Sequence, residues 1–333
     1  MPTSLFLKDF MNFTLSRRAL MTTAAAMACG NALAQGPAYP AQTIKLIVPY
    51  PAGGATDALA RMVGQKLQES WSVTVVVDNK PGAGGTIGNN LVAKATPDGY
   101  TVLMGITAII QQPTLMTLPY DAIKDFAPVT QVARSPSMFV VPLSSPVSTL
   151  KEFVALVKAN PGKYNYGTYG AGTSSHIQGS LLNLQAGLDM VHVPFAGAAP
   201  LVTNMVGGQL TSAFVDMASG RAHLKSFKAL AVTGTQRLPA LPGAPTFQEQ
   251  GYHSFDPYGW FGLFMPAATP GAVVGKFSDE VNRILRLSDV VARIEGLGLW
   301  VGGGKPEEFG QIVKSDAAVY AKIIKDAGIK LNQ

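Results

Sequence analysis

The stretch TIKLIVPYPAGGATD, residues 43–57, decides the fold together with VTVVVDNKPGAGGTIG, residues 73–88. Apolar residues alternate in the first half of each stretch, as they do in a half-buried β-strand. A glycine-rich loop follows each strand, and after the first loop Leu59, Val63 and Leu67 recur at helical spacing. The pattern predicts two successive strand–loop–helix units, which are typical of an α/β fold.

Both glycine-rich loops suit the binding of an anion. Glycine at a strand-to-helix loop lets backbone N–H groups approach an anion at the positive end of the helix dipole. Thr56 or Asp57 can cap the first helix. Neither loop has the Gly-Lys-Ser/Thr of a P-loop or a clean Gly-x-Gly-x-x-Gly with its acidic partner, so no nucleotide signature is present. Glycines that only make the turns remain an alternative interpretation.

Length and composition indicate a two-domain globular protein. The chain has 333 residues, of which 47% are hydrophobic and 14% charged, so it can bury a large core and disorder is not expected. Its Lys and Arg residues are scattered without a basic run, which argues against nucleic acid as a partner.

Residues 1–34 have the pattern of an export signal. Arg17 and Arg18 precede a short apolar run, Leu20–Ala28, which is too short to span a bilayer. The small-x-small triplet Ala32–Ala34 predicts cleavage before Gln35 and a periplasmic location. The paired arginines fit either twin-arginine or ordinary export.

The single cysteine and the start of the chain bear on the same segment. Cys29 lacks the usual preceding leucine of a lipoprotein signal, so we expect it to leave with the signal, and the mature chain to contain no cysteine. Met11 is an alternative start. Loss of Lys8, Arg17, Arg18 and Asp9 with this segment lowers the formal net charge from +6 to +4. A mild positive balance suits anionic ligands.

The strand–loop–helix pattern restarts in the middle of the chain. Residues 137–142 form another predicted strand, and Thr149 with Glu152 fits a capping box that begins a helix. The loop TYGAGTSSH, residues 168–176, repeats the glycine-rich plan, and a strand at residues 260–266 precedes the C-terminal helices. The region around residues 121–132 is predicted only as a connecting segment.

This arrangement predicts an α/β protein with two lobes, each a doubly wound, mostly parallel sheet. We expect a signal peptide at 1–34, the first lobe at 35–136, the second lobe at 137–254 and a return to the first lobe at 255–333. A hinged two-lobe binding protein has this form, with its ligand between the strand ends of both lobes.

A catalytic or metal site is less well supported. Ser174, Ser175, His176 and Asp216 are the residue types of a nucleophilic triad, but no Gly-x-Ser-x-Gly elbow surrounds them. The four histidines are dispersed without metal-ligand spacing, so no metal and no cofactor are expected. A hydrolase or transferase on a two-lobed α/β scaffold is nevertheless kept as the alternative function.

Three sequence blocks resemble a known family. The blocks YPAGGATD (50–57), VDNKPGAGG (77–85) and ATPDGYT (95–101) look like successive signatures of the Bug-type substrate-binding proteins of tripartite tricarboxylate transporters. The resemblance covers essentially the whole mature chain. It implies a two-lobed, Venus-flytrap-like receptor, similar to type II periplasmic binding proteins, that takes a small carboxylate and serves membrane permease subunits, is not an enzyme, and is expected to be a monomer. A receptor that reports to a sensor kinase is the other alternative.

The resemblance also implies a set of ligand-binding positions. In the family, one ligand carboxylate is held by main-chain amides and ordered waters from first-lobe loops, while the second lobe varies. The implied positions here are Tyr50, Gly53, Gly54, Ala55, Thr56, Asp57, Thr107 and Ala108 in the first lobe, and Tyr169, Gly170, Thr173, Ser174, Gly197, Ala198 and Asp216 in the second. Asp57 is interpreted as a cap rather than a direct contact.

Two departures from the family pattern bear on the ligand. The family often has Tyr-Lys-Gly where this chain has Phe195-Ala196-Gly197, and the segment 104–110 is more apolar than usual. Both differences favour a ligand with an apolar or aromatic body. Asp216, where it faces the ligand, would favour an amino or hydroxyl group. The predicted strand-end loops contain no arginine and only one lysine, Lys80, so we expect binding without a buried cation.

Overall fold

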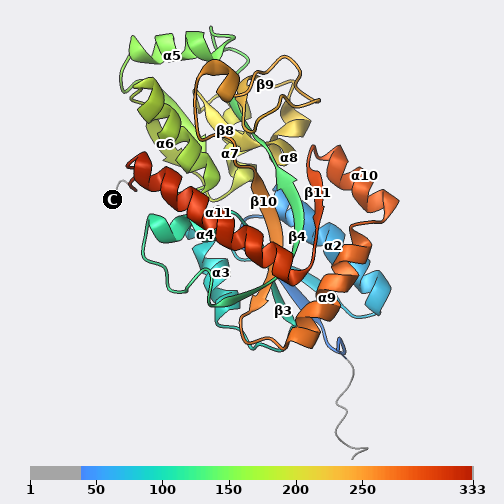
Figure 1. The fold of residues 1–333 in the computed structure, drawn as a ribbon. Coiled ribbons are helices and arrows are strands. Elements are labelled where there is room, and N and C mark those ends of the chain that lie inside the picture. The colour runs from blue at the N-terminus through green and yellow to red at the C-terminus, as the bar shows by residue number, and fades with distance from the viewer. Residues whose placement is uncertain (1–38, 332–333) are drawn as a thin grey trace, which may run out of the picture. The chain divides into compact units, whose positions relative to one another are not determined.

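Two mixed β-sheets organise the protein, a computed structural model in which residues 39–331 are described (Figure 1). The predicted export signal, residues 1–34, lies outside the described residues. None of the described helices combines the length and the apolar character that a membrane span requires.

The first sheet takes its strands from both ends of the described chain. They are β1 (Ile44–Val48), β2 (Val75–Asn79), β3 (Thr101–Ile106), β4 (Phe126–Ser135), β10 (Gly259–Pro266) and β11 (Trp300–Gly303). The order is β11-β4-β10-β3-β1-β2. β1 pairs in parallel with β2 and β3, whereas β10 pairs antiparallel with β3 and β4, and β4 with β11.

Helices cover both faces of this sheet. They are α2 (Ala55–Trp71), α3 (Thr86–Ala93), α4 (Ala108–Gln111), α9 (Gly271–Ile284), α10 (Ser288–Gly296) and α11 (Pro306–Asp326), with short 3-10 turns at Ala83–Gly85 and Gln112–Thr114. α3 and α11 enclose a core that contains Leu103, Phe264 and Phe309. α2 packs beside α9, where the rings of Trp71 and Phe277 meet edge to face with 5.5 Å between centroids.

The second sheet comes from the middle of the chain. Its strands are β5 (Ser137–Pro142), β6 (Asn165–Thr168), β7 (Val191–Pro194), β8 (Ala213–Asp216) and β9 (Phe227–Val232), in the order β7-β6-β8-β5-β9. Its helices are α5 (Leu150–Lys158), α6 (Ser174–Ala186), α7 (Ala198–Val206) and α8 (Met217–Gly220), with 3-10 turns at Arg221–His223 and Gln248–Gln250. Alternation along β5 sends Phe139 and Met138 into separate cores on opposite faces.

The fold tests several predictions made from the sequence. The capping box is confirmed, since Thr149 Oγ1 accepts from the N–H of Glu152 at 3.1 Å and the Glu152 carboxylate accepts from the N–H of Thr149 at 3.2 Å. The α/β class is confirmed, but both sheets are mixed and not mostly parallel, because β4, β5, β9, β10 and β11 pair antiparallel with their neighbours. The segment predicted as a connection, residues 121–132, overlaps the ten-residue strand β4, and β11 was not predicted.

The chain passes between the sheets at two places that lie side by side. Pro136 alone separates β4 from β5, and residues 233–258 lead from β9 back to β10. The N–H of Ser137 donates to Thr233 Oγ1 at 2.8 Å, and the N–H of Thr233 donates to the carbonyl of Ser137 at 2.8 Å. These bonds tie the two crossings together.

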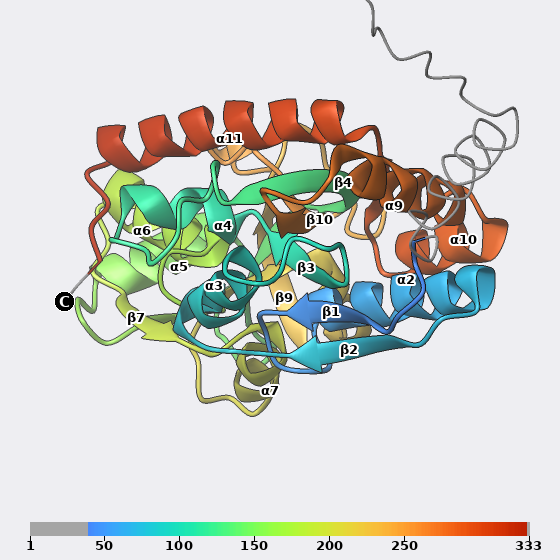
Figure 2. The same cartoon turned by 90° about the horizontal axis from the view of Figure 1, so that it is seen from below.

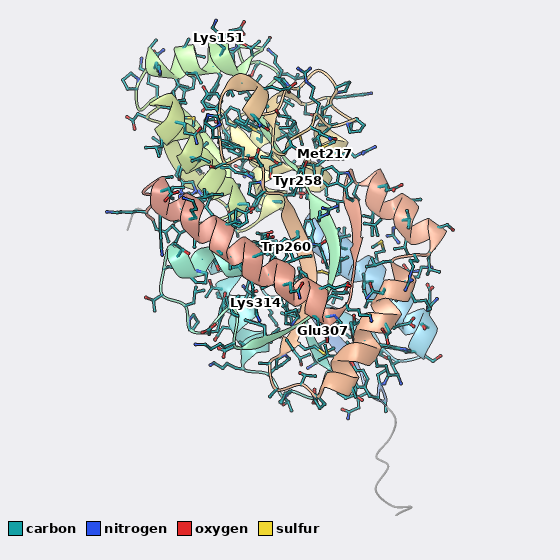
Figure 3. All side chains as sticks on the ribbon, viewed as in Figure 1. Lys151, Met217, Tyr258, Trp260, Glu307 and Lys314 are labelled. Carbon is teal, nitrogen blue, oxygen red and sulfur yellow. The ribbon has the colours of Figure 1, made fainter. Side chains whose placement is uncertain are left out.

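α11 runs along the first sheet and reaches the second (Figure 2). Phe309 and Val313 are buried in the first core, while Ile323 and Ala327 near its end also pack against the core that contains Phe139. Trp260 of β10 lies against this helix and donates from its indole nitrogen to Asp316 at 3.0 Å (Figure 3). One helix therefore contacts the cores of both sheets.

Candidate functional site

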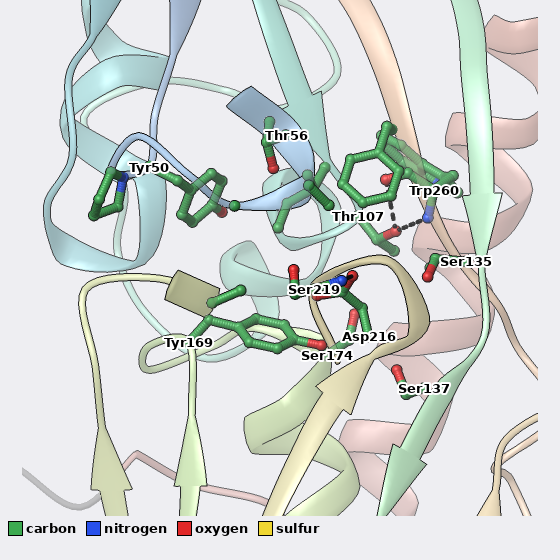
Figure 4. A pocket seen from close by; sticks show the side chains of 17 residues that line it. Tyr50, Thr56, Thr107, Ser135, Ser137, Tyr169, Ser174, Asp216, Ser219 and Trp260 are labelled. Carbon is green, nitrogen blue, oxygen red and sulfur yellow. Dashed lines mark hydrogen bonds between the residues drawn. The ribbon is translucent and has the colours of Figure 1, made fainter. Parts of the chain in front are cut away.

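A cleft opens where the strand ends of the two sheets face each other (Figure 4). It holds about 570 Å³ of free space, including the part open to solvent. The seventeen residues that line it are Tyr50, Pro51, Gly54, Ala55, Thr56, Ile106, Thr107, Ser135, Ser137, Tyr169, Ser174, Ala198, Asp216, Ser219, Gly259, Trp260 and Phe261.

The β1–α2 loop forms the first wall and is braced from behind by a charged network. Gly53 has φ +90°, a conformation that favours glycine, and Gly54 is the N-cap of α2. The Asp57 carboxylate accepts from the N–H of Gly53 at 3.1 Å and pairs with Arg61 at 2.9 Å. Asn79 donates to both Asp57 and the carbonyl of Tyr50, each at 3.0 Å. Asp57 thus orients the loop and does not line the cleft.

The protonation of Asp57 reflects this network. Burial raises the pKa of the Asp57 carboxyl, but hydrogen bonds from Arg61, Gly53 and Asn79 outweigh burial and hold it below its usual value. Of the two predicted caps, Asp57 is the one that acts: it is the third residue of α2, and its carboxylate accepts from the N–H of Gly53, just before the helix. Thr56 does not cap α2.

Three longer helices present unpaired N–H groups at the cleft. In α2 the first backbone donor with an intrahelical partner is Ala58, in α6 it is Ile177, and in α7 it is Leu201. The N–H groups before these residues have no intrahelical acceptor, and each helix adds the positive end of its dipole. Gly54, Ala55 and Thr56, Ser174, and Ala198 place these helix starts on the cleft wall.

The β6–α6 loop forms the opposite wall and is braced by neutral groups. Thr173 is the N-cap of α6, and its hydroxyl donates to the carbonyl of Gly170 at 2.7 Å. The Ser175 hydroxyl accepts from the N–H of Tyr169 at 3.1 Å, and His176 Nδ1 accepts from the N–H of Gly172 at 3.3 Å. The Thr173 hydroxyl is thus consumed inside the loop.

Behind this loop two histidines stack. The rings of His176 and His192 lie 4.2 Å apart, and His192 Nε2 is 2.7 Å from the Thr168 hydroxyl. Burial lowers the pKa of His176 to about 4, and burial together with the neighbouring ring of His176 lowers the pKa of His192 to about 4. Both rings are therefore neutral at pH 7.

Ser174 is held by the other sheet's elements and not by a histidine. Gln111 Nε2 lies 2.9 Å from Ser174 Oγ, and Ser174 Oγ lies 3.2 Å from Gln111 Oε1. No serine–histidine pair of a nucleophilic triad forms among Ser174, Ser175 and His176 in the described residues. The bond joins α6 of the second sheet to α4 of the first.

Two tyrosines frame the cleft from opposite sides, and a threonine closes its back. Burial raises the pKa of both Tyr50 and Tyr169 far above the usual range, so both phenols are neutral. The Tyr50 hydroxyl donates to the carbonyl of Gly84 at 3.0 Å. The Thr107 hydroxyl accepts from the N–H of Trp260 at 2.8 Å (Figure 4), which leaves little of it for a ligand.

Asp216 is the single charged residue among those that line the cleft. It ends β8 and caps α8, with Oδ1 accepting from the N–H of Ser219 at 2.9 Å. Burial raises the pKa of the Asp216 carboxyl. No lysine or arginine lines the cleft, and the described residues contain no cluster of His, Cys, Asp or Glu that could hold a metal ion.

The mouth of the cleft is narrow because the two walls nearly touch. A Cβ on Gly54 would lie 4.0 Å from the Cβ of Ala198. Gly197 has φ +152°, and a Cβ there would lie 2.8 Å from Pro51 Cδ, so only glycine fits.

The sequence-predicted positions divide into two groups. Those on the cleft wall are Tyr50, Gly54, Ala55, Thr56, Thr107, Tyr169, Ser174, Ala198 and Asp216. Those behind it are Gly53, Asp57, Ala108, Gly170, Thr173 and Gly197, which shape the loops and helix starts. The lining residues that sequence reasoning missed are Pro51, Ile106, Ser135, Ser137, Ser219, Gly259, Trp260 and Phe261.

Comparison with known proteins identifies the group to which this architecture belongs. The sequence profile of the TctC family, described as tripartite tricarboxylate transporter family receptor, matches residues 59–329. The chain belongs to this family. A relative from Pseudomonas sp. strain P51, a UPF0065 protein in the tcbD-tcbE intergenic region, is 37% identical, with 95% of this chain and 96% of that protein covered.

Solved structures show the same two-lobed fold. The periplasmic binding protein BugD is 32% identical with a TM-score of 0.84, over 88% of this chain and 99% of BugD. Rpa4515 from R. palustris, solved with adipate, is 30% identical with a TM-score of 0.84, over 88% and 99%. MatC from Rhodopseudomonas palustris, solved with malate, is 30% identical with a TM-score of 0.82, over 86% and 100%. TctC-family proteins are periplasmic solute-binding proteins and not enzymes, so the alternative of a hydrolase or transferase is dropped.

Proposed function

We propose that this TctC-family protein captures a small organic carboxylate in the cleft and delivers it to a membrane permease of the tripartite tricarboxylate type. The observation that carries the proposal is the convergence of the α2, α6 and α7 N-termini on a cleft without lysine or arginine. Unpaired N–H groups at helix starts form a seat for an anion.

The ligand affinity of such an anion-binding site can be estimated from its hydrogen bonds. Each charge-assisted hydrogen bond contributes roughly 1.5–3 kcal/mol. A few of these bonds, less the cost of immobilising the ligand, leave an affinity in the micromolar range, about 8 kcal/mol. That affinity suits a receptor that must also release its ligand.

Two kinds of support favour a carboxylate over other anions. The relatives at 30% identity were solved with adipate and with malate, which are both carboxylates. The apolar side chains of Ile106, Trp260 and Phe261 line the part of the cleft away from the loops, where an aliphatic or aromatic ligand body would pack. A tricarboxylate would bring more charge than these walls can offset.

The division into lobes is part of the proposal. We assign the first lobe to residues 35–136 and 255–333 and the second lobe to residues 137–254, with the hinge at Pro136 and the 233–258 crossing. The contact of Ile323 and Ala327 with the second core means that the end of α11 must slide or detach when the lobes separate.

Location and partners are proposed from the sequence. We expect export to the periplasm with cleavage before Gln35, a monomeric mature protein, and delivery to the permease subunits. An intact mass of protein recovered from the periplasm should begin at Gln35, and a mass beginning at Met1 or Met11 would contradict export with cleavage.

A thermal-shift screen tests ligand capture. The panel should contain aliphatic and aromatic carboxylates of graded length, each beside its neutral amide, so that adipate is compared with adipamide. We expect at least one carboxylate to raise the melting temperature while its amide does not, because the helix N-termini favour the anion. Equal shifts for acid and amide, or none throughout the panel, would refute a carboxylate seat.

A further inference from the structure

The end of the cleft near the chain crossing has a different character from its mouth. Asp216 lies directly beside Ser137 in the antiparallel pairing of β8 with β5, and Ser137 follows Pro136. Gly54 and Ala198 approach each other at the mouth. The starts of α2 and α7, where Gly54 and Ala198 meet, and the buried carboxyl therefore belong to different parts of the same cleft, whereas Ser174 at the start of α6 lies beside Asp216 (Figure 4).

The Asp216 carboxyl is not neutralised by the protein. It forms no ion pair with any described residue; Oδ1 accepts from the N–H of Ser219, and the backbone N–H of Ala218 also offsets part of the rise that burial causes in its pKa. The Ser219 hydroxyl contributes to the electrostatics of the carboxyl, yet its oxygen is buried and has no partner with hydrogen-bond geometry among the described residues. Buried polar groups are normally paired, so the Ser219 hydroxyl beside Asp216 lacks, within the described part of the chain, a partner that a ligand could supply.

We propose that Asp216 is a specificity-determining residue that accepts a hydrogen bond from a hydroxyl or ammonium group of the ligand. The proposal rests on the proposed function, because the ligand's carboxylate must occupy the part of the cleft beside the starts of α2 and α7. The ligand class is then a small acid that carries a hydrogen-bond donor on its body, such as a hydroxy acid or an amino acid.

The charges of the cleft favour this class over a plain dicarboxylate. A second ligand carboxylate near Asp216 would face a buried carboxyl with no lysine or arginine on the wall to separate the two. Like charges at short range in a buried site repel strongly. A donor in the same place adds a hydrogen bond to Asp216 without a second charge of the same sign, and a hydrogen bond to a charged group corresponds to about tenfold to about a hundredfold in affinity.

The competing explanation is that Asp216 only caps α8. Asparagine is as good an N-cap as aspartate and has nearly the same size, so Asp216→Asn keeps the cap while it removes the charge. Asp189→Asn is the matched control, since Asp189 belongs to the same half of the molecule, is exposed and lies outside the cleft. Both variants change the net charge equally.

The test uses ligands that differ only at the far end. One series is caproate, ε-hydroxycaproate, ε-aminocaproate and adipate, and a shorter series is butyrate, γ-hydroxybutyrate, γ-aminobutyrate and succinate. Titration calorimetry gives the Kd of each acid. We expect a donor-bearing acid to bind about tenfold or more tightly than the dicarboxylate of the same length. Asp216→Asn should remove that preference and strengthen dicarboxylate binding, whereas Asp189→Asn should change neither.

Several results would overturn the proposal. Tightest binding of a dicarboxylate by the unaltered protein would do so, above all with proton uptake, because Asp216 would then donate a proton instead of accepting a bond. Equal changes in Kd for all acids in Asp216→Asn would leave only the capping role. Failure of every acid in both series and in the wider screen would instead refute the carboxylate seat itself. Asp216→Ser, which also caps, serves as the second variant if Asp216→Asn does not fold.

Discussion

The β1–α2 and β6–α6 loops share one plan but are braced by opposite kinds of chemistry. The first is held from behind by Asp57, Arg61 and Asn79, which form a charged network that reaches solvent. The second is held by buried hydroxyls and by His176, which are all neutral at pH 7. Each loop nevertheless offers the N-terminus of a long helix to the same cleft.

The comparison shows that two tasks, presenting N–H donors to the ligand and stabilising the loop, depend on different residues. Presentation of N–H donors depends on the helix start and on small residues at its front, whereas loop stability depends on what lies behind. We therefore expect the walls to differ in their response to mutation and to pH, although both face the same ligand.

The largest effect should come from a side chain at the front of the first wall. Gly54 has φ −86° and ψ 173°, which any residue can adopt, so Gly54→Val should fold with little change in melting temperature. Its methyl groups would project toward Ala198 and keep the walls apart, since a Cβ alone already lies 4.0 Å from the Ala198 Cβ. Ligand affinity should fall about a hundredfold or more, the equivalent of losing about two charge-assisted bonds.

Gly54→Ala is the matched control, and calorimetric titration of a ligand found in the screen is the measurement. Because its Cβ meets only an ordinary contact, the loss should stay below about tenfold. Unchanged affinity in Gly54→Val would show that the first wall does not close on the ligand.

The next effect concerns the charged brace. Asp57→Ala leaves the N–H of Gly53 and the Asn79 amide without their acceptor, and should lower the free energy of unfolding by about 1–3 kcal/mol. Arg61→Ala removes only the solvent-exposed partner and should cost less than about 1 kcal/mol. Denaturant unfolding of both variants measures this difference. Equal losses would mean that the ion pair, rather than the loop bonds, stabilises the first wall.

The pH dependence should distinguish the braces. The folded-state pKa of about 4 for His176 and His192 lies below the usual 6.5. As the pH falls, the unfolded chain therefore takes up protons on these histidines at a higher pH than the folded protein does. The free energy of unfolding should therefore fall as pH drops from about 6.5 to about 4, by at most about 1.4 kcal/mol per pH unit for each histidine. The lowered pKa of Asp57 stabilises the folded protein at every pH above 3.8, the usual pKa of the carboxyl. This stabilisation is lost only as the pH falls below that value.

Unfolding curves measured at several pH values check this order. His192→Gln should flatten the slope between pH 6.5 and 4, while His253→Gln, at an exposed position, should leave it unchanged. A slope that persists in His192→Gln would place the acid sensitivity elsewhere.

The smallest effect should be that of salt on affinity. Because no lysine or arginine lines the cleft, its donors are fixed dipoles that mobile ions screen weakly once the cleft is closed. Between about 0.05 M and about 0.5 M salt we expect the affinity to fall by less than about tenfold. A hundredfold loss would point to surface cations that hold the ligand.

The sequence predicted the parts of the fold that obey local rules. Strands that precede glycine-rich loops, such as β1 and β6, and the Thr149 capping box were found because propensity and tertiary structure agree there. β4 was missed because Pro128 interrupts its apolar pattern and its pairing depends on β10, more than a hundred residues later. β11 is short and rich in glycine, so only its partner β4 makes it a strand.

The site divides in the same way. Loop residues such as Tyr50 and Ser174 were predicted, since glycine-rich strand ends mark the edge where ligands bind. Ser135, Ser137 and Trp260 carry no such signal, because they enter the cleft only through the crossing of the chain between the sheets. Antiparallel pairing of β10 with β3 brings the start of β10 to the carboxyl end of β3, and parallel pairing of these two strands would not have done so.

Because Pro136 alone separates β4 from β5, the proposed hinge between the lobes lies within the wall of the cleft. Ser135 and Ser137 flank Pro136, whereas Gly54 and Ala198 meet at the far end of the cleft. A rotation about Pro136 therefore separates the mouth by the longest arc and hardly parts the two serines. A bound molecule should therefore lose its contacts near Gly54 and Ala198 first and those beside Asp216 last.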